Sequence, residues 1–399
     1  MAALVVFAAP AAPEEYVVRS WKKIKLSDVF TSEGAAIGDF NKDGKMDVAA
    51  GPWWYEGPAF QAKHDFYPVK TFKPDNDYSN NFFTYVWDFN KDGYDDILVY
   101  GFPGKDASWF ENPKGKGEGH WARHEIFGVV DNESPTWWDV NGDKVPDICC
   151  TTGGKMGYIT IADGKFHAIS PKKNYQKFTH GMGLGDVNGD GKMDFMEAGG
   201  WYEQPKSLEG DPEWAFHPAK FGQGGAQMYA YDVNGDGLND VISSIQAHNW
   251  GLSWFEQQKD GSFAERVIMG KNESDNKYGV RFSQPHAIDL ADIDGDGLKD
   301  IVTGKRYFAH GSKGDAEPLA PAVLYWFKLV RKGSEVDWVP YQIDNDSGIG
   351  VQVMAADANG DGHLDIIVGN KKGAFVHLQE PKKVSKEEYE KAQPKPAGK

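Results

Sequence analysis

Seven short acidic segments have the residue types and spacing that bind calcium. In Asp186-Val187-Asn188-Gly189-Asp190-Gly191-Lys192-Met193-Asp194, oxygen-bearing side chains occupy positions one, three, five and nine, and the glycine at position six permits a sharp bend. Without a cation, these charges would repel one another. The sequence therefore predicts up to seven structural Ca²⁺ ions, with the ligands Asp39, Asn41, Asp43, Asp47, Asp88, Asn90, Asp92, Asp96, Asp139, Asn141, Asp143, Asp147, Asp186, Asn188, Asp190, Asp194, Asp232, Asn234, Asp236, Asp240, Asp292, Asp294, Asp296, Asp300, Asp357, Asn359, Asp361 and Asp365.

Ordinary turns and EF-hands are the alternatives for these segments. Asp, Asn and Gly are common in turns, but seven copies in one register, each followed by an apolar run, favour metal binding. An EF-hand would need an acidic twelfth position and flanking helices, whereas residues such as Val241-Ile242-Ser243 have strand character. In the third copy Lys144 replaces the glycine and Pro146 follows, so we expect that loop to bind metal poorly or to be empty.

The loops recur at intervals of 46 to 65 residues, which suits propeller blades of four strands each. An apolar strand enters each loop, a second leaves it, a third carries an aromatic pair such as Trp54-Tyr55, and a fourth alternates polar and apolar residues. The aromatic pairs would suit stacking on sugars, but their regular recurrence favours packing between blades. This order predicts an all-β, seven-bladed β-propeller with the calcium loops on one face.

The ends of the chain divide it into three parts. Residues 16–380 are predicted to form a single propeller, in which an N-terminal strand at Val17–Ile24 completes the last blade and closes the ring. Residues 381–399 are charged and contain proline, which predicts a disordered tail. Residues 1–13 combine an apolar stretch with Ala9-Pro10-Ala11, and we interpret them as the remnant of a secretory signal or a disordered start. The first interpretation predicts export to the periplasm or the extracellular space, where millimolar Ca²⁺ would fill weak loops.

Composition excludes some partners. A formal charge of −16 argues against nucleic acid or an anionic membrane surface, and no apolar run apart from the start approaches the roughly 20 residues of a membrane span. Cys149 and Cys150 are adjacent and cannot join distant segments. They fit a buried strand, and a vicinal disulfide is the alternative.

The repeated Asp-x-Asn-x-Asp-Gly-x-x-Asp between apolar strands resembles the FG-GAP or VCBS repeats of integrin-type and bacterial exported propellers, over about Val17 to Gln379. The segments Gly51–Glu56 and Gly304–His310 also look like the propeller domain of the aldos-2-ulose dehydratases, which eliminate water from oxidised sugars. Related calcium-loaded propellers are polysaccharide lyases. No cupin-like region follows the propeller in this sequence, so the resemblance does not extend to chemistry assigned to a cupin.

Candidate site residues lie where the face opposite the calcium loops surrounds the central channel. Residues just before the first strand of each blade, or just after the second, emerge there: Glu33, Asn81, Glu133, His180, Gln227, His286 and Gln352 on entry, and Lys155, His248, Asn249, Lys305, Arg306, Tyr307, Asn370 and Lys371 on exit, with His310 slightly beyond. A histidine at a strand end is often only a hydrogen-bonding residue, and Lys371-Lys372 would suit a solvated turn. The clustering of His248, His286 and His310 in two neighbouring blades nevertheless indicates a site.

Two function classes fit these residues. As a carbohydrate lyase or dehydratase, the protein would use His286 or His248 as base, with His180 as a further candidate; Lys305 and Arg306 would hold the oxyanion, and His310 or Tyr307 would protonate the leaving oxygen. As a non-catalytic module, the same face would bind glycan or protein. A Zn²⁺ or Fe site is less favoured by the sequence, because no histidine pair has the close local spacing of a metal motif.

Overall fold

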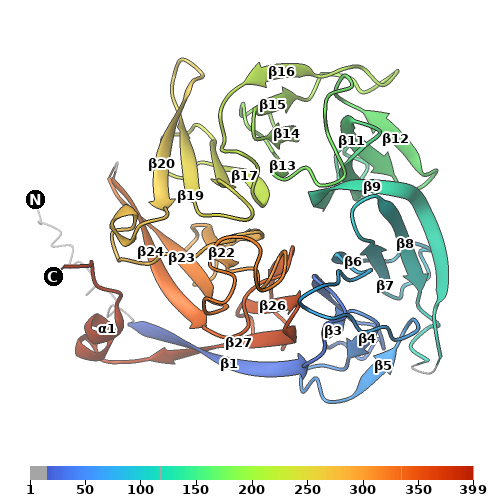
Figure 1. Cartoon of the computed structure of the whole chain (residues 1–399), viewed down its shortest axis with the longest axis horizontal. Helices are drawn as coiled ribbons and strands as arrows, with labels where there is room; N and C mark the ends of the chain where they lie inside the picture. The colour runs from blue at the N-terminus through green and yellow to red at the C-terminus, as the bar shows by residue number, and fades with distance from the viewer. Residues whose placement is uncertain (1–15, 117–118, 334, 399) are drawn as a thin grey trace, which may run out of the picture.

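Sheets of mainly antiparallel strands are arranged around a common centre in the structure, a computed structural model that describes residues 16–116, 119–333 and 335–398 (Figure 1). The proposed signal remnant at residues 1–13 lies outside the described residues. The expected all-β class is confirmed. No helix among the described residues is long and apolar enough to cross a membrane.

The strands follow one another in antiparallel runs of four, each starting at the strand closest to the centre. In chain order they are β2 (Ala35–Gly38), β3 (Asp47–Ala50), β4 (Trp53–Tyr55) and β5 (Lys63–Asp65); β6 (Phe83–Trp87), β7 (Asp96–Tyr100), β8 (Lys105–Glu111) and β9 (Ala122–Trp138); the end of β9 with β10 (Asp147–Thr152), β11 (Lys155–Thr160) and β12 (Lys165–Ala168); β13 (Met182–Gly185), β14 (Asp194–Glu197), β15 (Gly200–Glu203) and β16 (Ala215–Pro218); β17 (Gln227–Tyr231), β18 (Asp240–Ser244), β19 (Leu252–Gln257) and β20 (Phe263–Met269); β21 (Ile288–Ala291), β22 (Asp300–Gly304), β23 (Leu324–Lys332) and β24 (Glu335–Asp344); and β25 (Val353–Ala356), β26 (Asp365–Asn370) and β27 (Gly373–Lys383) with β1 (Val17–Ser27).

Each acidic loop joins the first strand of a run to the second, and its ninth residue is the first residue of the second strand. That ninth aspartate has a structural role of its own. Both carboxylate oxygens of Asp47 accept backbone hydrogen bonds, from Phe40 at 3.0 Å and from Gly57 at 2.8 Å, so it fastens the loop to the end of the third strand. Burial raises the pKa of Asp47 to about 6, against the lowering effect of these bonds. The third loop keeps the same backbone form, with Lys144 at φ 69° in place of glycine.

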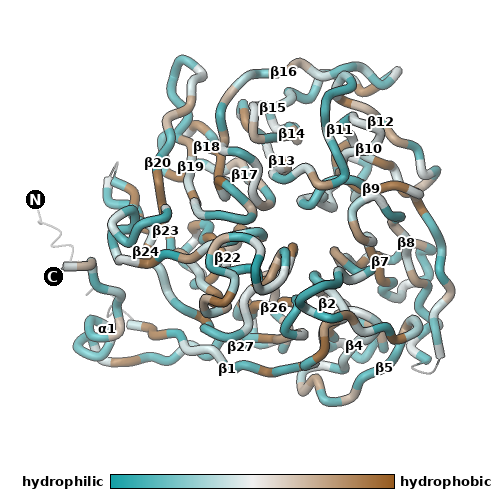
Figure 2. The backbone as a smooth tube through the Cα atoms, viewed as in Figure 1, coloured by the Kyte–Doolittle hydropathy of each residue, from teal (hydrophilic) through white to brown (hydrophobic). Residues whose placement is uncertain are grey.

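The core lies between neighbouring runs of strands. One buried cluster joins Val302 and Trp326 of one run to Val368 and Phe375 of the next. Hydrophobic residues recur along the strands of the runs (Figure 2). The aromatic pairs of the third strands are buried here, as Trp54, Tyr202 and Phe327 illustrate. The pairs therefore pack between sheets, as their recurrence favours.

The first and last strands lie side by side, because β1 pairs with β27 in register from Val17 opposite Lys383 to Ile24 opposite Val376. The expected disordered tail at 381–399 is wrong over much of its length. β27 extends to Lys383, and α1 (Lys386–Ala392) follows. The sequence contains the signal for this helix, since Ser385 and Glu388 form a capping box and Tyr389 packs against Tyr16.

The two cysteines are free, buried thiols in β10, in agreement with the strand interpretation.

Candidate functional site

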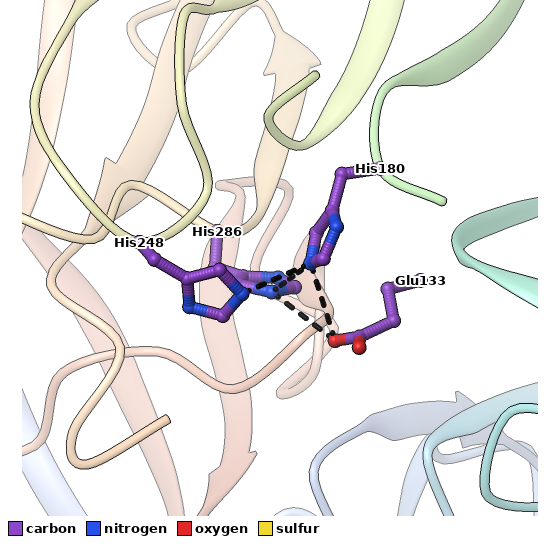
Figure 3. Close-up of side chains that lie close together, drawn as sticks. All are labelled: Glu133, His180, His248 and His286. Carbon is purple, nitrogen blue, oxygen red and sulfur yellow. Dashed lines mark hydrogen bonds and ion pairs between the residues drawn. The ribbon is translucent and has the colours of Figure 1, made fainter. Parts of the chain in front are cut away.

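Four side chains from different parts of the chain converge near the centre of the molecule (Figure 3). The Nε2 atom of His180 lies 3.1 Å from Nε2 of His248, 3.2 Å from Nε2 of His286 and 3.5 Å from Oε2 of Glu133. Oε2 of Glu133 lies 3.3 Å from Nε2 of His286. We call these four residues the central cluster. Because His180 precedes β13 and the acidic loop follows it, the cluster and the loops lie at opposite ends of the innermost strands.

A bulge in β9 directs Glu133 toward the centre. Asp131 pairs with Thr151 and Thr136 with Cys149, so four residues of β9 face a single residue of β10. Within the bulge the Glu133 amide donates to the carbonyl of Thr179 at 2.8 Å, immediately before His180. The carboxylate and the imidazole are therefore held by the same backbone contact.

Gln284 fixes the other two histidines. Its backbone is left-handed, with φ 59°, and its side chain is fully buried. The backbone amide of Gln284 donates to the backbone carbonyl of Asn249, next to His248. Its carbonyl accepts from the amides of both His286 and Arg306. A strained, non-glycine residue at this junction is typical of functional sites. The sequence pattern gave no indication of it.

Arg306 lies beneath the cluster and is almost fully buried. Its guanidinium donates to Oε2 of Glu33, to Nε2 of His286 at 2.8 Å and to Oε2 of Glu133 at 3.4 Å. With its donors turned to these groups, Arg306 holds the cluster together instead of pointing toward a ligand. Glu33, which entered the prediction only as a channel residue, is its main partner.

Electrostatics keep the carboxylate ionised and the buried imidazole neutral. Burial alone would raise the pKa of Glu133, but hydrogen bonds with His180 and His286 and the charge of Arg306 hold that pKa well below its usual range. Burial and the nearby guanidinium lower the pKa of His286 well below its usual range. Burial also lowers the pKa of His248, against the opposing effect of Asp315.

A second group of polar side chains adjoins the cluster. Asp315 accepts a hydrogen bond from Nδ1 of His310 at 2.8 Å and lies 3.5 Å from Nδ1 of His248. Burial would raise the pKa of Asp315, but its contacts with the two histidines lower it. The side chain of His310 is 52% exposed. A cluster residue is thus joined through one carboxylate to an accessible imidazole.

Two buried lysines flank these groups. Lys371 lies 4.4 Å above the ring of Tyr78, and Lys305 donates to Ser283 at 3.2 Å. Neither forms an ion pair with a carboxylate among the described residues, and burial lowers the pKa of each to about 8. The pKa shifts reflect the cost of placing an unpaired ammonium away from water.

Two hollows border the site. A pocket of about 310 Å³ is lined by His180, Tyr175, Phe178 and Glu197. A cleft of about 1260 Å³ is lined in part by Tyr78, whose ring centroid lies 6.4 Å from that of His310. We regard the smaller pocket as the approach to the cluster, because a cluster residue forms its wall.

The structure brings together His180, His248 and His286 of the predicted site residues, with Arg306 beneath them and His310 alongside. Lys305 points instead to Ser283, and Tyr307 stacks on Phe308 under Lys372. Asp315, by contrast, was not among the predicted residues, because its position in a long loop carries no repeat signal.

The model of the FG-GAP-like repeat matches the sequence at residues 88–150, 139–196 and 232–303. Each matched segment begins at the first aspartate of one acidic loop and ends beyond the next loop. The chain contains FG-GAP-like repeats. No curated protein matches the sequence.

Two solved structures match this chain to different extents. BBS1N, from a crystal structure in complex with ARL6DN, is 10% identical, with a TM-score of 0.53 over 90% of this chain and 98% of that chain. The V. cholerae biofilm matrix protein Bap1 is 18% identical, with a TM-score of 0.33 over 71% of this chain, which spans 42% of the Bap1 chain. The likeness to BBS1N supports the fold alone. The TM-score of Bap1 is too low to support a common fold.

Proposed function

We propose that this protein is a calcium-dependent, seven-bladed β-propeller that acts on carbohydrate, eliminating water or an alcohol from an oxidised sugar. Closure of the ring is supported by β1, which completes the run of β25, β26 and β27 at the other end of the sequence. Closure by the two chain ends would protect sheet edges that otherwise pair with other molecules.

Calcium in the acidic loops is supported by their common arrangement. In the fourth loop, the carboxylate of the first aspartate accepts hydrogen bonds from the backbone amides of Asp190 and Gly191. In the sixth loop, the carboxylates of Asp292, Asp294 and Asp300 lie within 4.8 Å of one another. Ca²⁺ prefers such oxygen ligands and would offset their repulsion. Export to a calcium-rich compartment would suit this requirement.

The observation that carries the proposed chemistry is the His310–Asp315 pair beside the central cluster. Asp315 accepts from Nδ1 of His310, which leaves Nε2 of this exposed ring to act as a base. His180, His248 and His286 are less suited to that role, because their Nε2 atoms face one another. This geometry therefore moves the proposed base from His286 or His248 to His310.

In the proposed step, Nε2 of His310 takes the proton from a carbon next to a carbonyl group. The electron pair of the broken C–H bond forms a C=C bond as the C–O bond to the neighbouring carbon breaks. The leaving oxygen takes a proton from Lys371, whose ammonium lies over Tyr78 beside His310. Water or an alcohol departs, and no oxidant or reductant is needed. Of the residues in this step, Tyr78 lines the cleft of about 1260 Å³, which is large enough for a sugar.

Incubation with a panel of keto-sugars and uronic polysaccharides, followed by the absorbance of the unsaturated product, tests this proposal. We expect His310→Ala and Asp315→Asn to lower kcat/KM at least about 100-fold. The matched control is His217→Ala, at an outer-strand histidine that stacks on Trp201 away from the cluster. Equal turnover in all variants would refute the assignment. Sugar binding without product would favour a non-catalytic, glycan-binding propeller.

A further inference from the structure

We propose that Glu133, His180, His248 and His286 bind one divalent transition-metal ion. This ion is distinct from the calcium expected in the acidic loops and lies at the opposite end of the innermost strands. Binding itself does not depend on the elimination chemistry, whereas a catalytic role for the ion rests on that proposed function.

The spacing of the four donor atoms fits a tetrahedral ion. One ligand atom from each of the four residues lies within 4.8 Å of the others. The four separations given above, between Nε2 atoms and Oε2 of Glu133, run from 3.1 to 3.5 Å. Zinc–nitrogen and zinc–oxygen bonds are about 2.0–2.2 Å long, which places donor atoms about 3.3–3.6 Å apart in a regular tetrahedron. The side chains converge on one point from four sides (Figure 3). The donors need to move little to bind an ion.

Hydrogen bonds alone do not satisfy this arrangement. Nε2 of His180 faces three acceptors within 3.5 Å, but a ring nitrogen carries at most one hydrogen and can donate it to only one of them. His286 cannot supply the missing hydrogen, because its Nε2 accepts from Arg306. At least one pair of lone pairs is therefore left facing each other. A cation at the centre would accept these lone pairs as ligands and so remove the repulsion between them.

Arg306 is the alternative cation for these lone pairs. Its guanidinium contacts only Glu133 and His286 of the cluster, and its other hydrogen bonds go to Glu33. No bond from it to His180 or His248 is present among the described residues. With both carboxylates ionised, Glu33, Glu133 and Arg306 sum to a charge of −1. A divalent ion would take the lone pair of His286 from Arg306 and leave the guanidinium with its two carboxylates.

Two features favour a metal that also binds an external ligand. His286 is fully buried, whereas the side chains of His180 and His248 are 15% and 23% exposed, so the open side faces the pocket at His180. Asp315 lies beside Nδ1 of His248, where an outer carboxylate commonly orients a metal-bound imidazole. Imidazole donors favour Zn²⁺, Cu²⁺, Fe²⁺ or Ni²⁺ over Ca²⁺ and Mg²⁺. In the proposed elimination, the substrate carbonyl would bind such an ion as a fifth ligand and be polarised by it.

The test is metal binding by the full chain, purified without a histidine tag. After chelation and dialysis with excess Ca²⁺, titration with Co²⁺ is expected to give one equivalent bound, with the intense visible absorption of a tetrahedral site. His180→Ala and His248→Ala should each weaken binding at least about 100-fold. The control His217→Ala should bind Co²⁺ as the wild type does. Melting curves and circular dichroism establish that every variant is folded.

The outcomes separate the two proposals. Absence of stoichiometric Co²⁺ or Zn²⁺ binding in the folded wild type, or equal affinity in the His180 and His248 variants, would overturn the metal site. One equivalent of metal without turnover of any sugar would keep the metal site and refute the elimination. Turnover that survives complete metal removal would keep the elimination and refute a catalytic role for the ion.

Discussion

His377 allows a quantitative test of how burial acts in this fold. The residue lies in β27, between Lys23 of β1 and Ile366 of β26, and it is fully buried. Neither ring nitrogen has a hydrogen-bond partner within the part of the chain that the structure describes. Burial lowers the pKa of His377 to about 4, with Asp344 opposing the shift and Lys23 adding to it. The folded protein therefore keeps this imidazole neutral at pH values where an unfolded chain protonates it.

The expected magnitude follows from the difference between the two states. An unfolded histidine has a pKa of about 6.5, so the difference is about 2.5 pKa units, or about 3 kcal/mol at 1.36 kcal/mol per unit. Because the folded pKa is the lower one, the unfolded chain binds the extra proton between pH 4 and pH 6.5. This contribution to stability is complete above pH 6.5 and is lost as the pH falls to about 4.

Denaturant unfolding between pH 4 and pH 7.5 tests this prediction in the wild type and two variants, His377→Phe and His377→Asn. Neither replacement takes up a proton in this range. The free energy of unfolding of the wild type, relative to either variant, should fall by about 3 kcal/mol from pH 7.5 to pH 4. Taking this difference cancels titration of the acidic loops, which all three proteins share. Parallel pH profiles would refute the reasoning, whatever the absolute stabilities of the variants.

Four further predictions concern the loops, the centre and the contacts between strands. Chelation of calcium should lower the melting temperature, because each ion present at 100 times its dissociation constant stabilises the folded state by about 2.7 kcal/mol. An equal melting temperature with and without chelator, measured by calorimetry, would contradict this prediction. Glu33→Ala should cost about 3–5 kcal/mol in urea unfolding, because it leaves the buried guanidinium of Arg306 with a weaker partner set; a cost below about 1 kcal/mol would contradict this. Gly183→Ala should lower the free energy of unfolding by about 1–3 kcal/mol or more, because the added Cβ would lie 1.9 Å from the carbonyl oxygen of Met228 on the parallel strand β17. Gly199→Ala is the control, because the nearest atom to its Cβ would be 3.5 Å away. Asp315→Asn should weaken Co²⁺ binding about 10- to 100-fold in competition with a chromophoric chelator, and unchanged affinity would exclude an orienting role.

The repeat could be predicted because its signal is local. Each acidic loop carries its residues within nine positions, and the apolar segments on both sides indicate strands. The tail was mispredicted for the opposite reason. Its polar composition predicts disorder, but the capping box at Ser385 and the packing of Tyr389 on Tyr16 stabilise a helix there. A few specific contacts are enough to order such a segment.

The central cluster could be predicted only in part, because its members are distant in sequence. His180 and His286 are 106 residues apart, and His180 and His248 are 68 apart, so no local metal motif exists. In helical or hairpin metal sites the ligands follow one another closely. Where a different repeat supplies each ligand, the spacing reflects the length of the repeats. The absence of a close histidine pair therefore does not argue against a metal bound between repeats.

A register signal was nevertheless present in the sequence. Glu33, Glu133, His180 and His286 each stand six residues before the first aspartate of the acidic loop that follows them. Because that loop fixes the end of the innermost strand, the same offset places all four side chains at the same height on the opposite side of the fold. Repeats that share a backbone can thus each contribute one donor to a common centre while every other position varies. Aligning the repeats on their loops, and comparing the residues at one offset, would identify such a site where a search for adjacent histidines does not.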